Sequence, residues 1–118
     1  MMPAGSALHG SYAVTDFHAG ANDVAKAYAR AYRERYKIDA DNYSAWTYDA
    51  LHPLALANNN ARSTDPEAVR KAIVGIRRYI GSEGVCNFDE SGEGLRGYNV
   101  VSNDDGKVVF IKRVAFDR

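Results

Sequence analysis

Residues able to carry acid–base, metal or nucleophilic chemistry are few in this sequence and widely spaced. The three histidines are His9, His18 and His52. None of them stands four residues from another metal ligand, and none follows a recognisable nucleophile turn. We therefore expect them on the surface or packed against a helix. Because no constellation of acid, base, nucleophile or metal ligands emerges, the sequence favours a protein that is not an enzyme and that uses no metal or other cofactor.

Two further features, a cysteine and an acidic segment, could in principle react or bind a metal, but their sequence context favours structural roles. Cys86 is the one cysteine, so no disulfide can form within the chain, and its neighbours supply no positive charge to activate a thiolate. We expect a small, partly buried thiol. The acidic segment 89–94 lacks the alternating acids and the terminal glutamate of a calcium-binding loop, and its glycines do not open a helix after a strand. We expect a solvated turn there.

Aromatic side chains are the unusual part of the composition, with eight tyrosines, four phenylalanines and one tryptophan. Tyr43, Trp46 and Tyr48 stand together where a helix is expected to begin, a place from which aromatic groups could line a ligand cleft. Helical spacing accounts for the same residues as buried packing groups, and both interpretations stay open. Tyr28 and Tyr32 also recur at helical spacing, and we expect them in the core or at an interface.

The elements that must position these residues fit a single domain. The 118 residues, 46% hydrophobic and 25% charged, have an ordinary globular composition. We expect a loose lead-in over residues 1–9 and one α/β unit over residues 10–118. Fifteen basic and fifteen acidic residues cancel, so no nucleic-acid partner is expected. No apolar run approaches the ~18 residues of a membrane span, and the first residues lack the basic and apolar regions of a signal peptide.

The predicted order of elements is β-α-α-α-β-β. A short strand is expected within residues 10–17. A helix follows it, capped by Asn22 or Asp23 and ending near Tyr36. The apolar stripe of this helix comprises Val24, Tyr28, Ala31, Tyr32 and Arg35.

A second helix is expected from about Asn42 to about Asn58. Its packing face repeats at steps of three and four residues and comprises Tyr43, Trp46, Ala50, Leu51, Leu54 and Ala57. Pro53 lies inside the helix, where it lacks a donor and crowds the preceding turn. We therefore expect a kink near His52.

A third helix and a closing hairpin complete the chain. Thr64 and Glu67 have the spacing of a capping box, which predicts the start of a helix, and Gly81 predicts its end. A glycine-rich stretch follows. Residues 98–116 then alternate as two strands around an Asp-Gly turn, a strong signal for a β-hairpin.

Three stretches, taken in order, resemble the C-terminal part of the type I periplasmic solute-binding proteins of ABC transporters, the branched-chain amino-acid receptor group. DNYSAWTYDALHPLALA (41–57) resembles that family's Tyr-Asp-Ala helix, and STDPEAVRKAI (63–73) resembles its Thr-Asp-Pro-Glu helix. FDESGEGLRGYNVVSNDDGKVVFI (88–111) resembles its Phe-Asp turn and closing hairpin. GSYAVTDF (10–17) is similar to the strand after which the family's chain crosses between lobes, so the resemblance covers residues 10 to about 114.

The resemblance implies a partial type I periplasmic-binding-protein fold and a fragment of the solute-binding component of an ABC transporter for amino acids or related small carboxylates. It implies a periplasmic location and a membrane permease as partner, and it brings Tyr43, Trp46 and Tyr48 closest to the family's ligand cleft. The matched section spans both lobes of such receptors, so a sheet edge and an apolar helix face would be exposed. We therefore expect a homodimer or higher oligomer. The alternative is a structural or interaction protein, a remnant of such a receptor that binds no ligand and self-associates.

Overall fold

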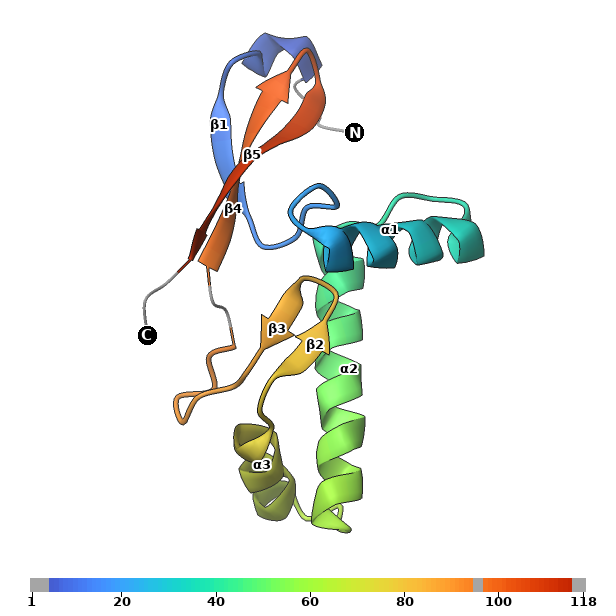
Figure 1. Ribbon diagram of the computed structural model, residues 1–118, viewed down its shortest axis with the longest axis vertical. Helices are drawn as coiled ribbons and strands as arrows, with labels where there is room; N and C mark the ends of the chain where they lie inside the picture. The colour runs from blue at the N-terminus through green and yellow to red at the C-terminus, as the bar shows by residue number, and fades with distance from the viewer. Residues whose placement is uncertain (1–4, 95–96, 116–118) are drawn as a thin grey trace.

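The computed structural model describes residues 5–94 and 97–115 and combines helices with antiparallel strands, as the α/β prediction requires (Figure 1). In chain order the elements are η1 (Gly5–Leu8, a 3₁₀ helix), β1 (Tyr12–Thr15), α1 (Asp23–Tyr36), α2 (Asn42–Ala61), α3 (Pro66–Gly75), β2 (Tyr79–Gly81), β3 (Gly84–Cys86), β4 (Gly97–Asp104) and β5 (Lys107–Ala115). One sheet has the strand order β1-β4-β5, and a second sheet consists of β2 and β3. The predicted order therefore gains a short hairpin, β2–β3, between α3 and the closing hairpin.

The closing hairpin is confirmed, and its turn has the predicted chemistry. β4 and β5 pair antiparallel, and the two residues between them, Asp105 and Gly106, have φ of +46° and +85°. Two successive left-handed residues match the twist of the strands that they connect, which explains the Asp-Gly pair. The Asn103 side chain accepts a hydrogen bond from the Gly106 amide at 2.6 Å, so the turn is also fixed from within the strand.

Buried asparagines on β4 tie distant parts of the chain to the three-stranded sheet. Asn99 is fully buried and its Nδ2 donates to the carbonyl oxygen of Asp16 at 2.7 Å. The Nδ2 of Asn103 donates to the carbonyl oxygen of Gly5 at 2.9 Å. Residues 5–9, predicted as part of a loose lead-in, therefore include a short helix that is held against β4. Residues 1–4 of that lead-in lie outside the described residues.

The second helix differs in its length from the prediction. α2 starts at Asn42, as expected, because the Asp41 carboxylate caps it by accepting from the Ser44 amide at 2.8 Å. It ends at Ala61, past the expected Asn58, and Figure 1 draws it as one helix past His52. The helix thus continues through Pro53, which is fully buried.

The third helix departs from the prediction at both ends. Asp65, not Thr64, is the cap, since its carboxylate accepts from the Ala68 amide at 3.0 Å. The helix ends at Gly75 instead of Gly81, and Tyr79–Gly81 forms β2, which pairs with β3. Contacts with residues far away in the sequence determine where this helix ends. A Cβ on Gly81 would lie 2.5 Å from an oxygen of Asp49 on α2, so this glycine permits close approach to α2 instead of marking a helix end.

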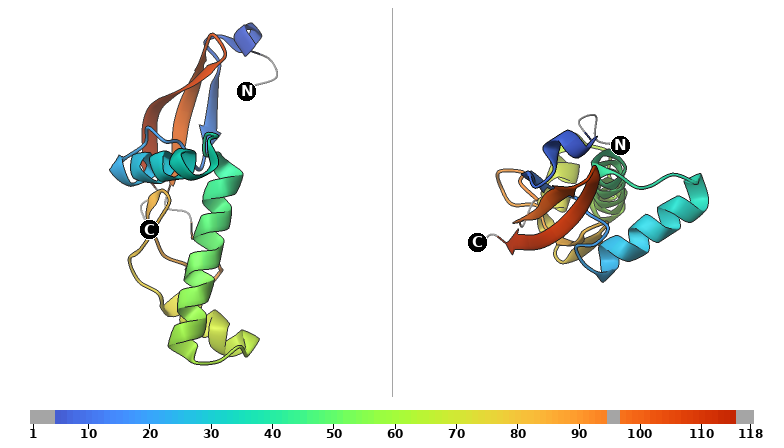
Figure 2. Two further views of the ribbon diagram at one scale, coloured as in Figure 1. Left: turned by 90° about the vertical axis from the view of Figure 1, so that its right-hand side faces the viewer. Right: turned by 90° about the horizontal axis from the view of Figure 1, so that it is seen from above.

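The β2–β3 turn fastens the helices to one another. The backbone N–H and the hydroxyl of buried Ser82 both donate to the Asp49 carboxylate, at 2.7 and 2.8 Å. The next residue, Glu83, accepts a hydrogen bond on its carbonyl oxygen from the side chain of Asn22, which also caps α1. α1 is thereby held across the N-terminal end of α2, whereas α3 packs beside the other end of α2 (Figures 1 and 2).

The hydrophobic core is small for the length of the chain. Among the described residues, two clusters of buried side chains contribute to the core, together with buried Val101 on β4: Phe17, Ala25 and Ala45 in one cluster, and Ala57, Val69 and Ile76 in the other. The accessible surface is 8173 Å², whereas a compact chain of this mass exposes roughly 6,300 Å². The radius of gyration is 16.3 Å against about 13.5 Å for a compact domain of 118 residues. The chain therefore presents apolar surface that a self-contained domain would bury.

The packing face predicted for the second helix illustrates this exposure. Of its six residues, only Ala57 is buried. The periodicity predicts that this whole face of α2 packs against protein. Among the described residues, only its end at Ala57 is covered, by the cluster that includes Val69 of α3. None of the described helices has the length and apolar character that crossing a membrane requires.

Candidate functional site

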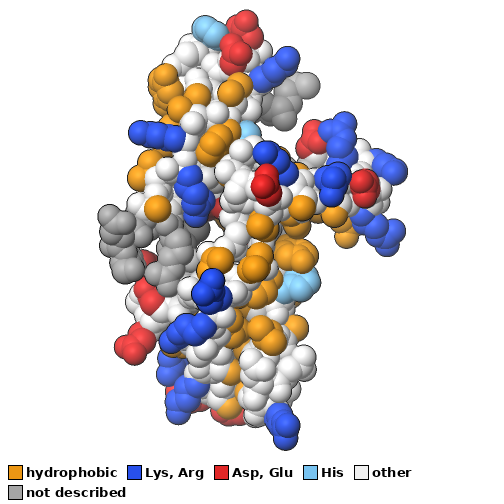
Figure 3. Space-filling model, in the orientation of Figure 1, with side chains coloured by type: hydrophobic (Ala, Val, Ile, Leu, Met, Phe, Trp, Pro, Cys, Tyr) orange, Lys and Arg blue, Asp and Glu red, His pale blue; other side chains and the backbone are white. Residues whose placement is uncertain are grey.

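A cleft of about 990 Å³ lies in the corner between α1 and the first half of α2, with the end of β2 at its base. Figure 3 shows hydrophobic side chains gathered where the two helices meet, with lysines and arginines at the far end of α1. The cleft is lined by Val24, Ala27, Tyr28, Ala31, Tyr32 and Tyr36 of α1, by Asp41, Tyr43, Ser44, Thr47, Tyr48, Leu51 and His52 at and after the start of α2, and by Ile80, Gly81 and Ser82.

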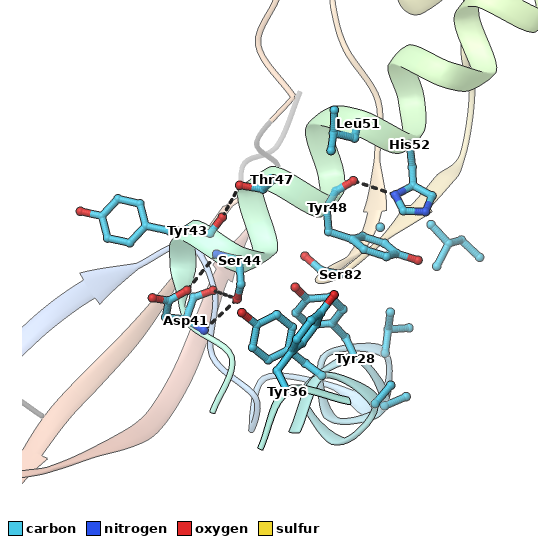
Figure 4. A pocket seen from close by; sticks show the side chains of 16 residues that line it. Tyr28, Tyr36, Asp41, Tyr43, Ser44, Thr47, Tyr48, Leu51, His52 and Ser82 are labelled. Atoms are coloured by element: carbon cyan, nitrogen blue, oxygen red, sulfur yellow. Dashed lines mark hydrogen bonds between the residues drawn. The ribbon is translucent and has the colours of Figure 1, made fainter. Parts of the chain in front are cut away.

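Tyrosine rings make the main wall of the cleft. Tyr28, Tyr32 and Tyr36 follow one another at four-residue steps, so they share one face of α1, and successive rings lie 5.9 and 4.7 Å apart. Tyr48 of α2 meets Tyr28 edge-on at 5.2 Å. Figure 4 shows these side chains converging from the two helices. Burial raises the pKa of the Tyr28 hydroxyl, with a hydrogen bond to the Ser44 side chain opposing this effect, so the hydroxyl stays protonated at neutral pH.

The α2 end of the cleft carries a carboxylate. Asp41 and Ser44 form a reciprocal cap, in which the Asp41 amide also donates to the Ser44 hydroxyl at 2.9 Å. The hydrogen bond from the Ser44 amide holds the pKa of Asp41 below its usual value, so this group is ionised at neutral pH. No lysine or arginine is found among the described residues that line the cleft, which gives the cleft a net negative character.

Two other polar side chains at the cleft, Thr47 and His52, are already hydrogen-bonded within α2. The Thr47 hydroxyl donates to the carbonyl oxygen of Tyr43 at 2.8 Å, and Nδ1 of His52 lies 3.0 Å from the carbonyl oxygen of Tyr48. The His52 ring also packs on the Tyr48 ring, with centroids 3.9 Å apart. A ligand would therefore meet aromatic faces, tyrosine hydroxyls and one carboxylate.

The structure separates the three residues predicted from the sequence. Tyr43 and Tyr48 line the cleft, but Trp46 is not among the lining residues. Trp46 instead packs edge-on against Tyr43, with ring centroids 5.5 Å apart, and 46% of its surface is exposed. The Tyr43 ring points away from the converging tyrosines, so it contributes at the rim (Figure 4). Of the three residues predicted to bind a ligand, Tyr43 and Tyr48 thus lie at this cleft and Trp46 does not, and ligand binding by them stays a prediction.

The sequence prediction missed the contribution of the first helix. Tyr36 was expected only as a helix end, and Tyr28 and Tyr32 only as packing residues, yet all three line the cleft. Their four-residue spacing was the available signal. Asp41 was missed because a capping residue is identified by its hydrogen bonds and not by its type alone.

His18, Cys86 and Asp89, which the sequence analysis considered for chemical roles, make packing contacts and hydrogen bonds within the fold. His18 stacks on Phe110, with centroids 5.8 Å apart, and Cys86 is half-buried and donates to the carbonyl oxygen of Gly94 at 3.2 Å. Asp89 accepts hydrogen bonds from the amides of Ser91 and Glu93, as in a self-contained turn. The thiol and the turn agree with the prediction, whereas His18 packs on a strand, β5, and not on a helix.

A second group, His9 with Asp104 and Asp105, brings three ligand-type atoms within 4.8 Å of one another at the tip of the closing hairpin. All three side chains are exposed. Nδ1 of His9, the atom that faces the carboxylates, already accepts a hydrogen bond from the Asp105 amide at 3.2 Å. We therefore assign no metal to this group.

Together the closing hairpin, the helix pair and the capped α2 define one section of a two-lobed solute-receptor fold. No protein-family model matches the sequence, and no curated protein matches it. Among solved structures, a leucine-binding protein from Thermotoga maritima is similar over 94% of this chain, with 31% sequence identity and a TM-score of 0.82. The matched part is 32% of that protein's chain.

Two structures with lower sequence identity share the fold. A branched-chain amino-acid transporter substrate-binding protein from Streptococcus pneumoniae, solved with isoleucine, matches 89% of this chain and 30% of its own, with 21% identity and a TM-score of 0.75. A solute-binding protein from R. palustris, solved with benzoate, matches 97% of this chain and 31% of its own, with 17% identity and a TM-score of 0.78. The predicted resemblance and the partial type I periplasmic-binding-protein fold are thus confirmed, and the chain spans about a third of the length of these receptors.

Proposed function

We propose that this chain is a solute-binding component, in fragment form, of an ABC transporter for amino acids. It makes and breaks no bonds, and it works in the periplasm with a membrane permease and with further copies of itself as partners. The observation that carries the proposal is the tyrosine-lined cleft between α1 and α2, in a fold shared with a leucine-binding protein. Its volume of about 990 Å³ lies at the upper end of the usual range for small-molecule sites.

The charges of the cleft favour an amino acid over a simple carboxylic acid. The Asp41 carboxylate attracts an ammonium group, and tyrosine faces also attract cations. A ligand carboxylate would be limited to neutral donors, such as the hydroxyls of Tyr28 and Tyr48, since no lining residue in the described ranges is a lysine or arginine. A benzoate-like acid lacks the ammonium group, so Asp41 would repel it without compensation.

The test is calorimetric titration of the purified chain with leucine, with 4-methylpentanoate, which is leucine without its amino group, and with benzoate. We expect heat from leucine alone. Ligand at a hundred times its dissociation constant should also stabilise the fold by ~2.7 kcal/mol. Binding of 4-methylpentanoate as tight as that of leucine would contradict the role of Asp41.

Two variants connect the binding to this cleft. Asp41→Asn removes the charge but keeps a good helix cap, and we expect it to weaken leucine binding by roughly tenfold or more. Tyr48→Ala removes part of the aromatic wall. Tyr12→Ala is the matched control, because Tyr12 lies on β1, is 71% exposed and does not line the cleft. Equal effects of Tyr12→Ala and Tyr48→Ala would place the ligand elsewhere.

The alternative function, a structural protein that self-associates without a ligand, also has an observation in its favour. Thr47 and His52 already have partners within α2, and much apolar surface is exposed. No binding of any amino acid by a folded, associated chain would favour this alternative over the solute-binding component.

A further inference from the structure

A cluster of charged side chains lies where the three-stranded sheet meets the helices. The junction cluster, as we name it, comprises Asp16 after β1, Asp49 of α2, Glu83 of the turn between β2 and β3, and Arg113 of β5. α1 faces the cluster through a neutral group, Asn22, whose Nδ2 donates to the carbonyl oxygen of Glu83 at 2.9 Å. Three carboxyl groups thus share one guanidinium, and carboxyl groups that share a site favour a proton on one of them.

The three-stranded sheet is held to the rest of the chain by few contacts. Figures 1 and 2 show the sheet standing beyond one end of α2, and in the described part of the chain none of the three α-helices packs along β1, β4 or β5. Phe17 supplies an apolar anchor among helix residues. Asn42, at the start of α2, accepts from the Thr15 hydroxyl at 2.9 Å and from the Phe17 amide at 3.2 Å. The orientation of the sheet relative to the helices therefore depends on a small set of side chains where the two parts meet.

Glu83 and Arg113 connect the two parts directly. Oε2 of Glu83 lies 4.0 Å from Nη1 of Arg113, and the two side chains are 17% and 30% exposed. The same Nη1 donates to Oδ1 of Asn99 on β4 at 3.3 Å, and Nδ2 of Asn99 donates to the carbonyl oxygen of Asp16 at 2.7 Å. A continuous path of polar contacts thus leads from the β2–β3 turn to β5, to β4 and to the end of β1.

The charge of Glu83 is set by this environment. Burial raises its pKa to about 8, Arg113 opposes the increase, and Asp16 and Asp49 add to it. The side chain is therefore neutral near neutral pH. Once ionised, it is repelled by the two aspartates and attracted by Arg113, because partly buried charges interact more strongly than charges in water. The gap of 4.0 Å to Arg113 then shortens towards the ~2.8 Å of a charge-assisted hydrogen bond.

We propose that the protonation state of Glu83 sets the orientation of the three-stranded sheet relative to the helices. The neutral carboxyl keeps the arrangement of Figure 1. The ionised carboxylate draws Arg113, and with it β5, towards the β2–β3 turn. Neither residue lines the cleft, and the switch needs no ligand, so it goes beyond the proposed function and is tested independently of it.

Spin-label distance measurements test the switch. In a Cys86→Ser background, one label is attached at Lys107→Cys, at the tip of the closing hairpin, and the other at Ala55→Cys on α2; both positions are exposed. Lys107 and Arg113 lie six residues apart along β5, about 20 Å, so a small rotation at the junction cluster moves the label measurably. An excess of unlabelled chain restricts the reading to pairs within one molecule. We expect the distance to change by a few ångströms between pH 6 and pH 10, with a midpoint near 8.

Variants of the junction cluster separate this switch from a merely structural role. Glu83→Gln keeps the neutral form, so its distance should match that of the native chain at low pH and should not change with pH. Arg113→Gln keeps a donor for Asn99 but removes the charge that opposes the high pKa of Glu83, so the midpoint should move to higher pH. Glu34→Gln, at an exposed position of α1, is the matched control and should keep the native profile. A native distance that is the same at every pH, a change that persists in Glu83→Gln, or an unchanged midpoint in Arg113→Gln would overturn the proposal.

Discussion

The side chain of Glu83 lies at the junction of the helices with the closing hairpin and is 17% exposed. Burial is the main cause that raises its pKa to about 8, with Asp16 and Asp49 adding to the effect and Arg113, at 4.0 Å, opposing it. The native state therefore holds a proton on this group that the unfolded chain releases near its ordinary value of 4.5. Ionisation of Glu83 destabilises the native state, so the free energy of unfolding should depend on pH through this residue.

We expect the free energy of unfolding of the native chain to fall as the pH rises from 4.5 to about 8, because the folded state binds the extra proton across this window. Glu83→Gln should flatten this dependence and be more stable than the native chain by about 1 kcal/mol above the window. Urea denaturation at several pH values measures the effect. Glu34→Gln, at an exposed position of α1, is the control that should leave the pH dependence unchanged.

The candidate site was partly predictable from single residues. Tyr43 and Tyr48 were identified by type and by their place at a helix start, and both line the cleft. Trp46 shares their type and neighbourhood, yet it lies two residues before Tyr48, and a step of two residues points side chains to nearly opposite sides of a helix. Residue type alone therefore does not separate a ligand wall from a packing surface, whereas the direction of each side chain does.

Among the elements, α3 provides a direct test of which residue caps a helix. We expect Asp65→Ala to lower the free energy of unfolding by about 1 kcal/mol, since the Ala68 amide loses its acceptor. Thr64→Ala should change it by less than about 0.5 kcal/mol. Urea denaturation followed by circular dichroism measures the free energy of unfolding of both variants. A larger loss from Thr64→Ala than from Asp65→Ala would support the capping box predicted from the sequence.

Elements with local start and stop signals were predictable, and elements held by distant residues were not. The Asp-Gly turn predicted the hairpin of β4 and β5 because the turn itself fixes the pairing of the strands. β2 and β3 were missed because they depend on Asp49, which is 33 residues away from Ser82 in sequence. The glycine that resembled a helix stop, Gly81, instead allows β2 to lie against α2.

At the scale of the whole molecule, a small core and a large exposed apolar surface must be reconciled with a stable fold. The buried clusters contain few large side chains, and each is centred on three residues. Conformational entropy opposes folding along the entire chain, whereas apolar burial is the main favourable contribution. Folding of this chain should therefore be coupled to association, which buries the remaining apolar surface.

Coupling of folding to association makes stability depend on concentration. If two folded copies are in equilibrium with unfolded chains, each tenfold dilution lowers the apparent stability by about 1.4 kcal/mol per dimer. We expect the melting temperature of the native chain to fall by several degrees over a hundredfold dilution. Leu54 is 41% exposed on the packing face predicted for α2, so Leu54→Asp should melt at a lower temperature that does not change with dilution. Leu56 is equally exposed but lies two residues further along, on another side of the helix, and Leu56→Asp should keep the native dependence. A native melting temperature independent of concentration would mean that the single chain folds without association, and that contacts between copies contribute nothing to the stability of the fold.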